Sequence, residues 1–158
     1  MRRRAMRSSI VPALLIPLIP ALAPALAAQS RAQYAGGTSS QLASGVDGRI
    51  EVSDEDYFAF YSKKVQVRVP YDRINLIEYG QTVSRRLALA VVISPLFLLA
   101  KSRKHFLTVG YMADDGKQQA LMFRVDKGGI RATLVSLEAR TGLKVEYQDE
   151  EARKAGKG

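Results

Sequence analysis

Short runs in which apolar and polar residues alternate restrict the fold of this chain more than any other feature. They recur at residues 50–52, 58–60, 65–69, 107–111 and 121–125. A period of two is typical of strands that bury one face. Only short turns separate most of these runs, whereas parallel neighbours would need a longer crossover, so the sequence predicts a mostly antiparallel sheet.

One amphipathic helix is expected after the last of these strands. Ile130, Leu134 and Leu137 stand at positions i, i+4 and i+7, which places them on one stripe of a helix. Gly142 stands where a left-handed residue commonly ends a helix, and residues 144–147 can add a short strand. A run of strands followed by one helix predicts an α+β fold.

Two local signals refine the strand prediction. Along residues 74–80 the apolar positions change face, which predicts a bulge or a strand that is covered on both sides. The residues Asp114, Asp115 and Gly116 predict a tight hairpin turn, because aspartate and glycine accept the positive φ that such turns require.

The first 27 residues have the form of a secretory signal. A cationic start precedes an apolar run that ends in Ala25, Leu26 and Ala27, a small-residue cleavage pattern. A retained anchor is the alternative, but four prolines in the run oppose a stable helix across a membrane. We therefore expect cleavage before Ala28 and export of the remainder to the periplasm or the outside of the cell.

Composition divides the chain after this signal into three parts. Residues 28–47 are small, polar and glycine-containing, which predicts a flexible linker. Residues 48–147 hold the strand and helix patterns and form the expected domain. Residues 148–158 are charged, which predicts a fraying tail.

The chain offers few groups for catalysis or metal binding. It has no cysteine, which excludes disulfides and thiolate sites, and a single histidine, His105, which we expect at the surface. The acids at 54–56 lack the spaced ligands of a calcium loop. The sequence also has no glycine-rich phosphate loop or nucleophile elbow, so we expect no enzyme, no cofactor and no metal site.

An apolar insert with basic flanks, residues 85–104, interrupts the strands. Its residues 87–100 carry no charge. As a helix they would reach roughly 21 Å, whereas a hydrocarbon core is about 30 Å thick. A single span is the least favoured interpretation, because it would also place the two halves of one sheet on opposite sides of a membrane.

Three other interpretations of the insert stay open. It is a helix packed on the open side of the sheet, a hairpin that breaks at Pro95 and dips into one leaflet, or an interface with a partner or a second copy. The absence of a polar stripe opposes a core helix in so small a domain. Cations at both ends favour the hairpin, since both ends would then lie at anionic headgroups.

The excess positive charge also lies around the insert. Four of the 24 lysines and arginines, and none of the 15 acids, fall in the expected signal, which leaves 20 cations against 15 acids. The five cations of the insert equal this excess; they are Arg85, Arg86, Lys101, Arg103 and Lys104. A nucleic-acid binder more often shows cations with interleaved aromatics, and export also argues against nucleic acid as a partner.

Two longer stretches resemble a known family. GRIEVSDEDYFAFYSKKVQVRVPYDRINLIEYG is similar to the front half of bacterial pleckstrin-homology and GRAM-type domains, with an acidic turn, an aromatic strand and a Pro-Tyr-x-x-Ile corner. HFLTVGYMADDGKQQALMFRV through ARTG resembles the back half. The resemblance covers residues 48–147 and extends to small exported bacterial proteins of unassigned function. It implies a strongly bent sheet or split barrel with one C-terminal helix, to which this chain adds an apolar helical insert.

The resemblance implies a binding module rather than an enzyme. Some members of the family bind inositol phospholipids through basic residues in the loop after the first strand. In this chain residues 53–56 take that place, and they are acidic and would repel a phosphate. The fold is therefore carried over, but the ligand is not.

These observations predict an exported, non-enzymatic module that associates peripherally with an anionic membrane through the insert. The alternative is a soluble protein–protein interaction or self-associating domain, with the insert as core or interface. A third hypothesis is a small-ligand site on the aromatic strand with Tyr57, Phe58, Phe60 and Tyr61. The residues expected to contact membrane or partner are Arg85, Arg86, Leu96, Phe97, Leu98, Leu99, Lys101, Arg103 and Lys104.

Overall fold

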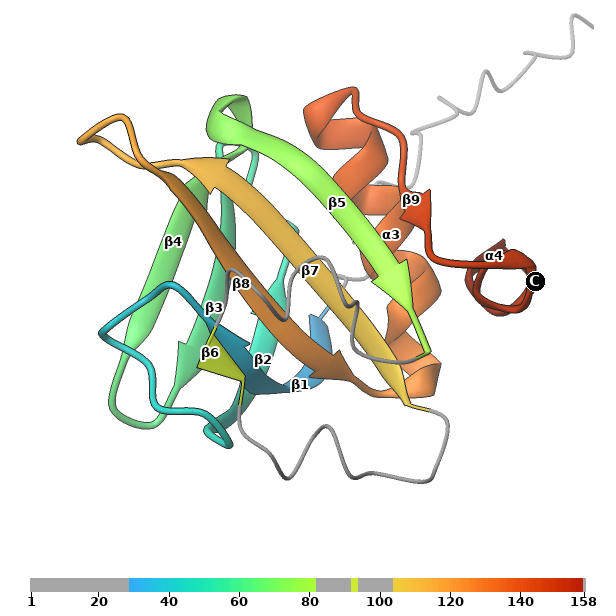
Figure 1. The fold of residues 1–158 in the computed structure, drawn as a ribbon, viewed down its shortest axis with the longest axis horizontal. Coiled ribbons are helices and arrows are strands. Elements are labelled where there is room, and N and C mark those ends of the chain that lie inside the picture. Colours follow the sequence, from blue (N-terminus) through green and yellow to red (C-terminus); the bar gives the residue numbers. More distant parts are fainter. Residues whose placement is uncertain (1–28, 82–91, 94–103, 158) are drawn as a thin grey trace, which may run out of the picture.

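The computed structural model describes residues 29–81, 92–93 and 104–157. The chain forms, in order, β1 (Gln29–Gly37), β2 (Asp47–Glu51), β3 (Tyr57–Ser62), β4 (Gln66–Pro70), a 3₁₀ turn η1 (Tyr71–Arg73), β5 (Ile74–Gly80), β6 (Val92–Ile93), β7 (His105–Met112), β8 (Gln118–Val125), α3 (Lys127–Thr141), β9 (Glu146–Tyr147) and α4 (Glu150–Lys157) (Figure 1). The strand order is β4-β3-β2-β1-β8-β7-β5-β9, and β6 pairs with β1 beside this path. Among the described strand pairs, all are antiparallel except β5 with β9, which confirms the α+β fold and the mostly antiparallel sheet.

The sheet bends so that its two halves face each other. In the strand order β2 and β1 separate β3 from β8. The ring of Phe123 on β8 nevertheless packs on Phe58 and Phe60 of β3, with centroids 5.8 and 4.9 Å apart. Figure 1 accordingly shows β3 and β4 behind β7 and β8. Among the described strands the sheet stays open, with β4 at one end and β9 at the other.

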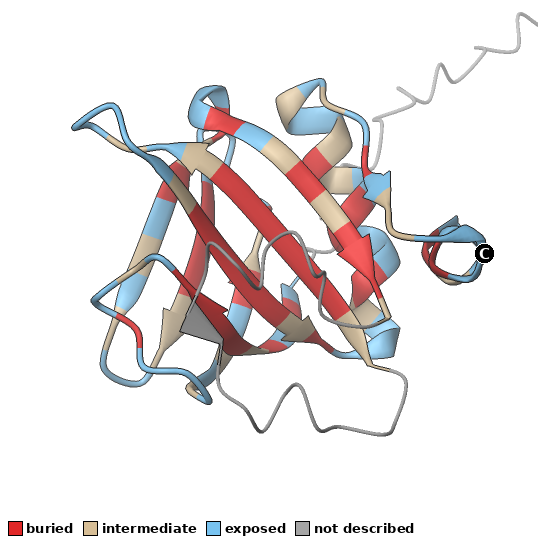
Figure 2. Cartoon of the chain, viewed as in Figure 1, coloured by how far each residue is buried: buried red, intermediate tan, exposed pale blue. Residues whose placement is uncertain are grey.

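Helix α3 packs on the core with the stripe that the sequence indicates. Ile130, Leu134 and Leu137 are buried in one cluster with the inner face of the sheet, seen as red segments in Figure 2. Gly142 ends the helix with φ +71°, and its amide donates to the Glu138 carbonyl at 3.0 Å. The predicted amphipathic helix and its glycine cap are confirmed.

The predicted linker, residues 28–47, is wrong for residues 29–37, which form strand β1 between β2 and β8. Tyr34 is only 1 % exposed and its ring packs edge-on against Phe123. Small residues here bring the helix close to the strand: a side chain at Gly129 would collide with Ser30, whose hydroxyl bonds Thr133 at 2.7 Å. Small polar residues therefore form a buried strand, since both neighbouring strands supply its hydrogen bonds.

The predicted fraying tail is also wrong for residues 150–157, which form helix α4. The Asp149 carboxylate accepts a hydrogen bond from the Ala152 amide at 2.6 Å, as an N-cap residue does. Ala152 is buried, and Gly156 lies so close to Tyr147 that a β-carbon there would approach the ring within 2.6 Å. Helix α4 thus docks one small-residue face on β9.

The predicted turn and bulge are both confirmed. Gly116 has φ +75°, and the Ala113 amide donates to the Lys117 carbonyl at 2.9 Å across the β7–β8 hairpin. In β5 the register with β7 shifts between Ile74 and Leu76. Residues 146–147 form the expected last short strand.

Candidate functional site

Both ends of the insert lie at one place on the sheet. Strands β5 and β7 are antiparallel neighbours, and Gly80 stands opposite Phe106. Beyond this pair, the Lys104 amide donates a hydrogen bond of 3.4 Å to the Gln81 carbonyl. A single membrane crossing would separate these two residues by a bilayer, so this geometry contradicts the single-span interpretation.

The middle of the insert is anchored to the sheet by β6. Ile93 pairs with Gly36 and Val92 with Gly37, both on β1. At these two positions the structure has a strand in place of the predicted helix. The helix prediction for the other residues of the apolar run lies outside the described residues.

Most of the predicted contact residues also lie outside the described residues: Arg85, Arg86, Leu96, Phe97, Leu98, Leu99, Lys101 and Arg103. Lys104 is described and is half-buried. The four side chains expected to insert belong to residues 94–103, which lie in the sequence between β6, paired with β1, and Lys104, just before β7.

The sheet face opposite the core carries apolar side chains on β7 and β8. Phe106 on β7 and Met122 on β8 are 4 % and 1 % exposed, and Thr108, opposite Met122, is also buried. Their neighbour Leu107 points into the core on which α3 packs. This second buried face was not among the features predicted from the sequence. The uncharged run 106–109 was the available signal, since strands buried on both faces lack a polar alternation.

His105 begins β7 next to Lys104 and interacts with Tyr79. Its Nδ1 contacts the Tyr79 hydroxyl, and the two rings stack with centroids 5.9 Å apart. Burial lowers the pKa of His105, and Lys127 lowers it further. Burial raises the pKa of Tyr79 to about 12. Both groups are therefore neutral at physiological pH, and the histidine is half-buried in this pair rather than a free surface base.

The aromatic strand β3 does not gather its side chains into one ligand site. Phe58 and Phe60 are fully buried in the core. Tyr57 and Tyr61 point to the other face, where the Arg49 guanidinium lies 5.5 Å from the centre of the Tyr61 ring. This division opposes the hypothesis of a small-ligand site that uses all four rings.

The acidic segment 53–56 is a turn held by its own backbone. The Asp54 carboxylate accepts hydrogen bonds from the amides of Asp56 and Tyr57 at 2.9 and 3.0 Å. These two bonds lower the pKa of Asp54. Within residues 29–81, 92–93 and 104–157, no three histidine, cysteine or acidic side chains stand close enough to hold a metal ion.

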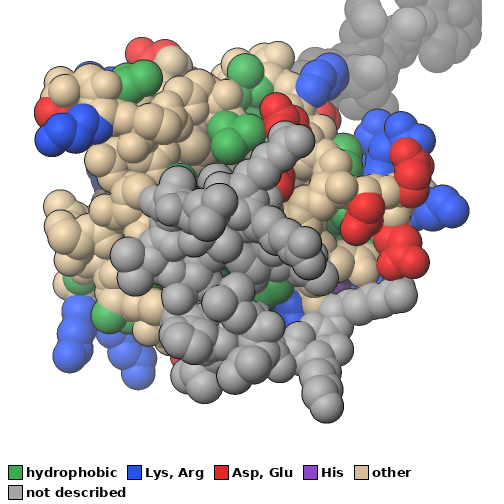
Figure 3. Space-filling model, viewed as in Figure 1, with side chains coloured by type: hydrophobic (Ala, Val, Ile, Leu, Met, Phe, Trp, Pro, Cys, Tyr) green, Lys and Arg blue, Asp and Glu red, His purple; other side chains and the backbone are tan. Residues whose placement is uncertain are grey.

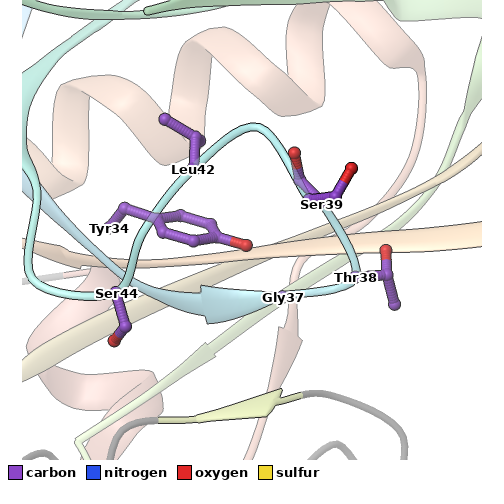
Figure 4. Close-up of a pocket in the computed structure, with 7 residues that line it drawn as sticks. Tyr34, Gly37, Thr38, Ser39, Leu42 and Ser44 are labelled. Carbon is purple, nitrogen blue, oxygen red and sulfur yellow. The ribbon is translucent and has the colours of Figure 1, made fainter. Parts of the chain in front are cut away.

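A cavity of about 450 Å³ opens under the loop between β1 and β2 (Figure 4). Its lining carries no charge and consists of Tyr34, Gly37, Thr38, Ser39, Ser40, Leu42 and Ser44. Figure 4 shows the Tyr34 ring directed toward Ser39. The Tyr34 hydroxyl has no hydrogen-bond partner in the described part of the chain, although the Ser39 amide lies nearby. Burial raises the pKa of Tyr34 to about 12, so this hydroxyl stays a neutral donor.

Comparison with known proteins gives no relative from which a site can be transferred. No family model matches the chain, and none of the curated proteins matches it. Among the helices that the structure describes, none is long and apolar enough to cross a membrane.

Proposed function

We propose that the protein is an exported, non-enzymatic binding module that associates peripherally with an anionic membrane through its apolar insert. The observation that carries the proposal is the hydrogen bond between Gln81 and Lys104, which closes the insert where β5 ends and β7 begins. An insert that leaves and returns at one place can meet a membrane from one side. The sequence supports the proposal because cations flank the fourteen uncharged residues 87–100 at both ends.

The pinning of the insert at β6 adds detail to this proposal. Because β6 holds Val92 and Ile93 on β1, we assign contact with the bilayer to the residues that follow this strand in the sequence. This segment contains Leu96, Phe97, Leu98 and Leu99, followed by Lys101 and Arg103. Apolar side chains followed by cations suit insertion into one leaflet with the charges at the headgroups.

A second candidate function has its own observation. Phe106 and Met122 are buried on the sheet face away from the core. An apolar face that is buried within the single chain is part of its core. In this alternative the insert also belongs to the core or to an interface, and the protein is a soluble interaction or self-associating domain.

Flotation with liposomes separates the two functions. We expect the chain from Ala28 to float with vesicles that contain phosphatidylglycerol, and high salt to reverse this only in part, because insertion of apolar side chains does not depend on salt. Phe97→Asp with Leu98→Asp should lower the affinity by more than roughly a hundredfold, since each buried apolar side chain contributes about 1.5–3 kcal/mol.

Val135→Asp is the matched control, because Val135 is an apolar side chain that is 64 % exposed on α3. It should float like the unaltered chain. An unaltered chain that stays at the bottom of the gradient at every salt concentration would overturn the proposal. An insert variant that no longer unfolds cooperatively would favour the second candidate.

A further inference from the structure

The register of the first four strands brings cations together on the outer face of the sheet. Arg31 on β1 stands directly opposite Arg49 on β2, and Arg49 stands opposite Tyr61 on β3. Arg68 on β4 lies diagonal to Tyr61, with its guanidinium 3.4 Å from the tyrosine hydroxyl. We call Arg31, Arg49, Tyr61 and Arg68 the arginine row.

The row faces solvent rather than the core. Arg31, Arg49 and Arg68 are exposed, and Tyr61 is half-buried between them. Lys63 and Lys64 are also exposed, at the turn between β3 and β4. Figure 3 shows lysine and arginine side chains gathered at the end of the molecule where this turn lies.

None of the ion pairs among the described residues involves the row. Two acids on β2 have other partners: Asp47 accepts a hydrogen bond from Gln33 at 2.9 Å, and Glu51 accepts one from Ser53.

Two further acids lie near the row without forming a salt bridge with it. Asp126 shares a shallow groove with Arg31, and its amide donates a hydrogen bond of 3.1 Å to the Arg31 carbonyl. The positive charge of Arg68 helps to lower the pKa of Asp54.

Two arginines directly opposite each other on neighbouring strands oppose folding, because like charges in this position repel. The row holds its guanidinium groups with neutral partners instead of acids. Arg49 lies over the Tyr61 ring, a cation–π contact, and Arg68 reaches the hydroxyl of the same ring. Such an arrangement orients guanidinium groups and leaves their charge available to an anion, for which a phosphate is a favoured match.

We propose that the arginine row is a second membrane-contact surface, which binds phosphate headgroups of an anionic bilayer. The inference rests on the proposed membrane association. Strand β1 connects the two surfaces, because it carries Arg31 and also pairs with β6 of the insert at Gly36 and Gly37. At about 3.4 Å per residue, Arg31 lies roughly 17 Å along β1 from Gly36. The row supplies the salt-sensitive part of binding and the insert the salt-resistant part.

The test compares charge variants of the purified chain that starts at Ala28, the form expected after cleavage of the signal. Arg31→Gln, Arg49→Gln and Arg68→Gln are combined in one variant. Lys144→Gln, Lys154→Gln and Lys157→Gln form the matched control, since they remove the same charge from exposed positions at the C-terminal end. Affinity is measured at low and high salt with vesicles of phosphatidylcholine that contain 30 % phosphatidylglycerol, or none.

We expect the arginine variant to bind the anionic vesicles roughly a hundredfold more weakly at low salt, about fivefold for each cation removed. At high salt it should bind like the unaltered protein, and the lysine control should lose much less affinity. Thermal unfolding checks that the exposed substitutions leave the fold intact.

Each outcome has one meaning. Equal losses of vesicle affinity in the arginine variant and the lysine control would overturn the proposal that the arginine row binds headgroups. The proposal for the insert would stay in place. An unaltered protein that binds no vesicles would overturn both proposals. If it then bound a single-stranded oligonucleotide, and the arginine variant did not, the row would be a nucleic-acid surface instead.

Discussion

Two tyrosines of this protein place the same group, a buried hydroxyl, in different surroundings. The hydroxyls of Tyr34 and Tyr79 are both buried at the end of a core ring, and burial raises both pKa values to about 12. The Tyr79 hydroxyl contacts Nδ1 of His105, whereas the Tyr34 hydroxyl has no partner in the described part of the chain. A buried donor without an acceptor reduces stability, and the two tyrosines therefore predict opposite responses to the loss of the oxygen.

Tyr34→Phe should leave the free energy of unfolding unchanged or raise it by about 1 kcal/mol, because it removes an unsatisfied polar group and keeps the ring contact with Phe123. Tyr79→Phe should lower the free energy by about 0.5–1.5 kcal/mol, because it leaves Nδ1 of His105 without its contact. Urea unfolding of both variants measures the difference. A loss of more than 1 kcal/mol in Tyr34→Phe would show that a ligand or an ordered water holds its hydroxyl.

Among the elements, β1 has the widest influence on the fold. It pairs with β2, β6 and β8, and its Tyr34 lies in the core. Its composition gives little sign of this, because Gln, Ser, Gly and Ala have weak strand preference in isolation. The strand forms because its neighbours offer a complete set of backbone hydrogen bonds, and because small side chains allow α3 to approach.

Removal of β1 should abolish folding. A chain that starts at Thr38 lacks the strand that pairs with both β2 and β8. It also lacks the buried side chains of Ala32, Tyr34 and Ala35. We expect it to show no cooperative thermal transition by circular dichroism, while the chain from Ala28 shows one. Cooperative unfolding of the shorter chain would restore the interpretation of this segment as a linker.

At the scale of the whole molecule, the described residues attach the insert to the domain at Gln81, β6 and Lys104. The domain around it is a bent sheet with α3 on its inner face. The β5–β7 pair could therefore exist as an ordinary hairpin without the insert. The stability of a chain without the insert therefore distinguishes an insert that acts on a membrane from one that covers the outer face of β7 and β8.

Replacement of residues 82–103 by Asn-Gly tests this directly. The Lys104 amide already donates to the Gln81 carbonyl at 3.4 Å, so the ends of β5 and β7 are close enough for a short turn to join them. If the insert serves membrane binding, the shortened chain should still unfold cooperatively, and its flotation with anionic vesicles should be lost at high salt, where the insert alone would hold the protein on the membrane. Failure to fold, or strong self-association in sedimentation through the exposed Phe106 and Met122, would indicate that the insert is part of the core.

The sequence by itself determined the features that depend on neighbours along the chain. The alternation in β2 to β4, β7 and β8, the stripe of α3, the glycine at its end and the Asp-Asp-Gly turn are all local patterns, and each is confirmed. Only the tertiary structure decided what depends on distant partners. Residues 29–37 become a strand because β8 is beside them, and the arginine row exists because register aligns β1, β2 and β4. Hydrogen bonds and charge contacts between remote segments leave no periodicity in either segment alone.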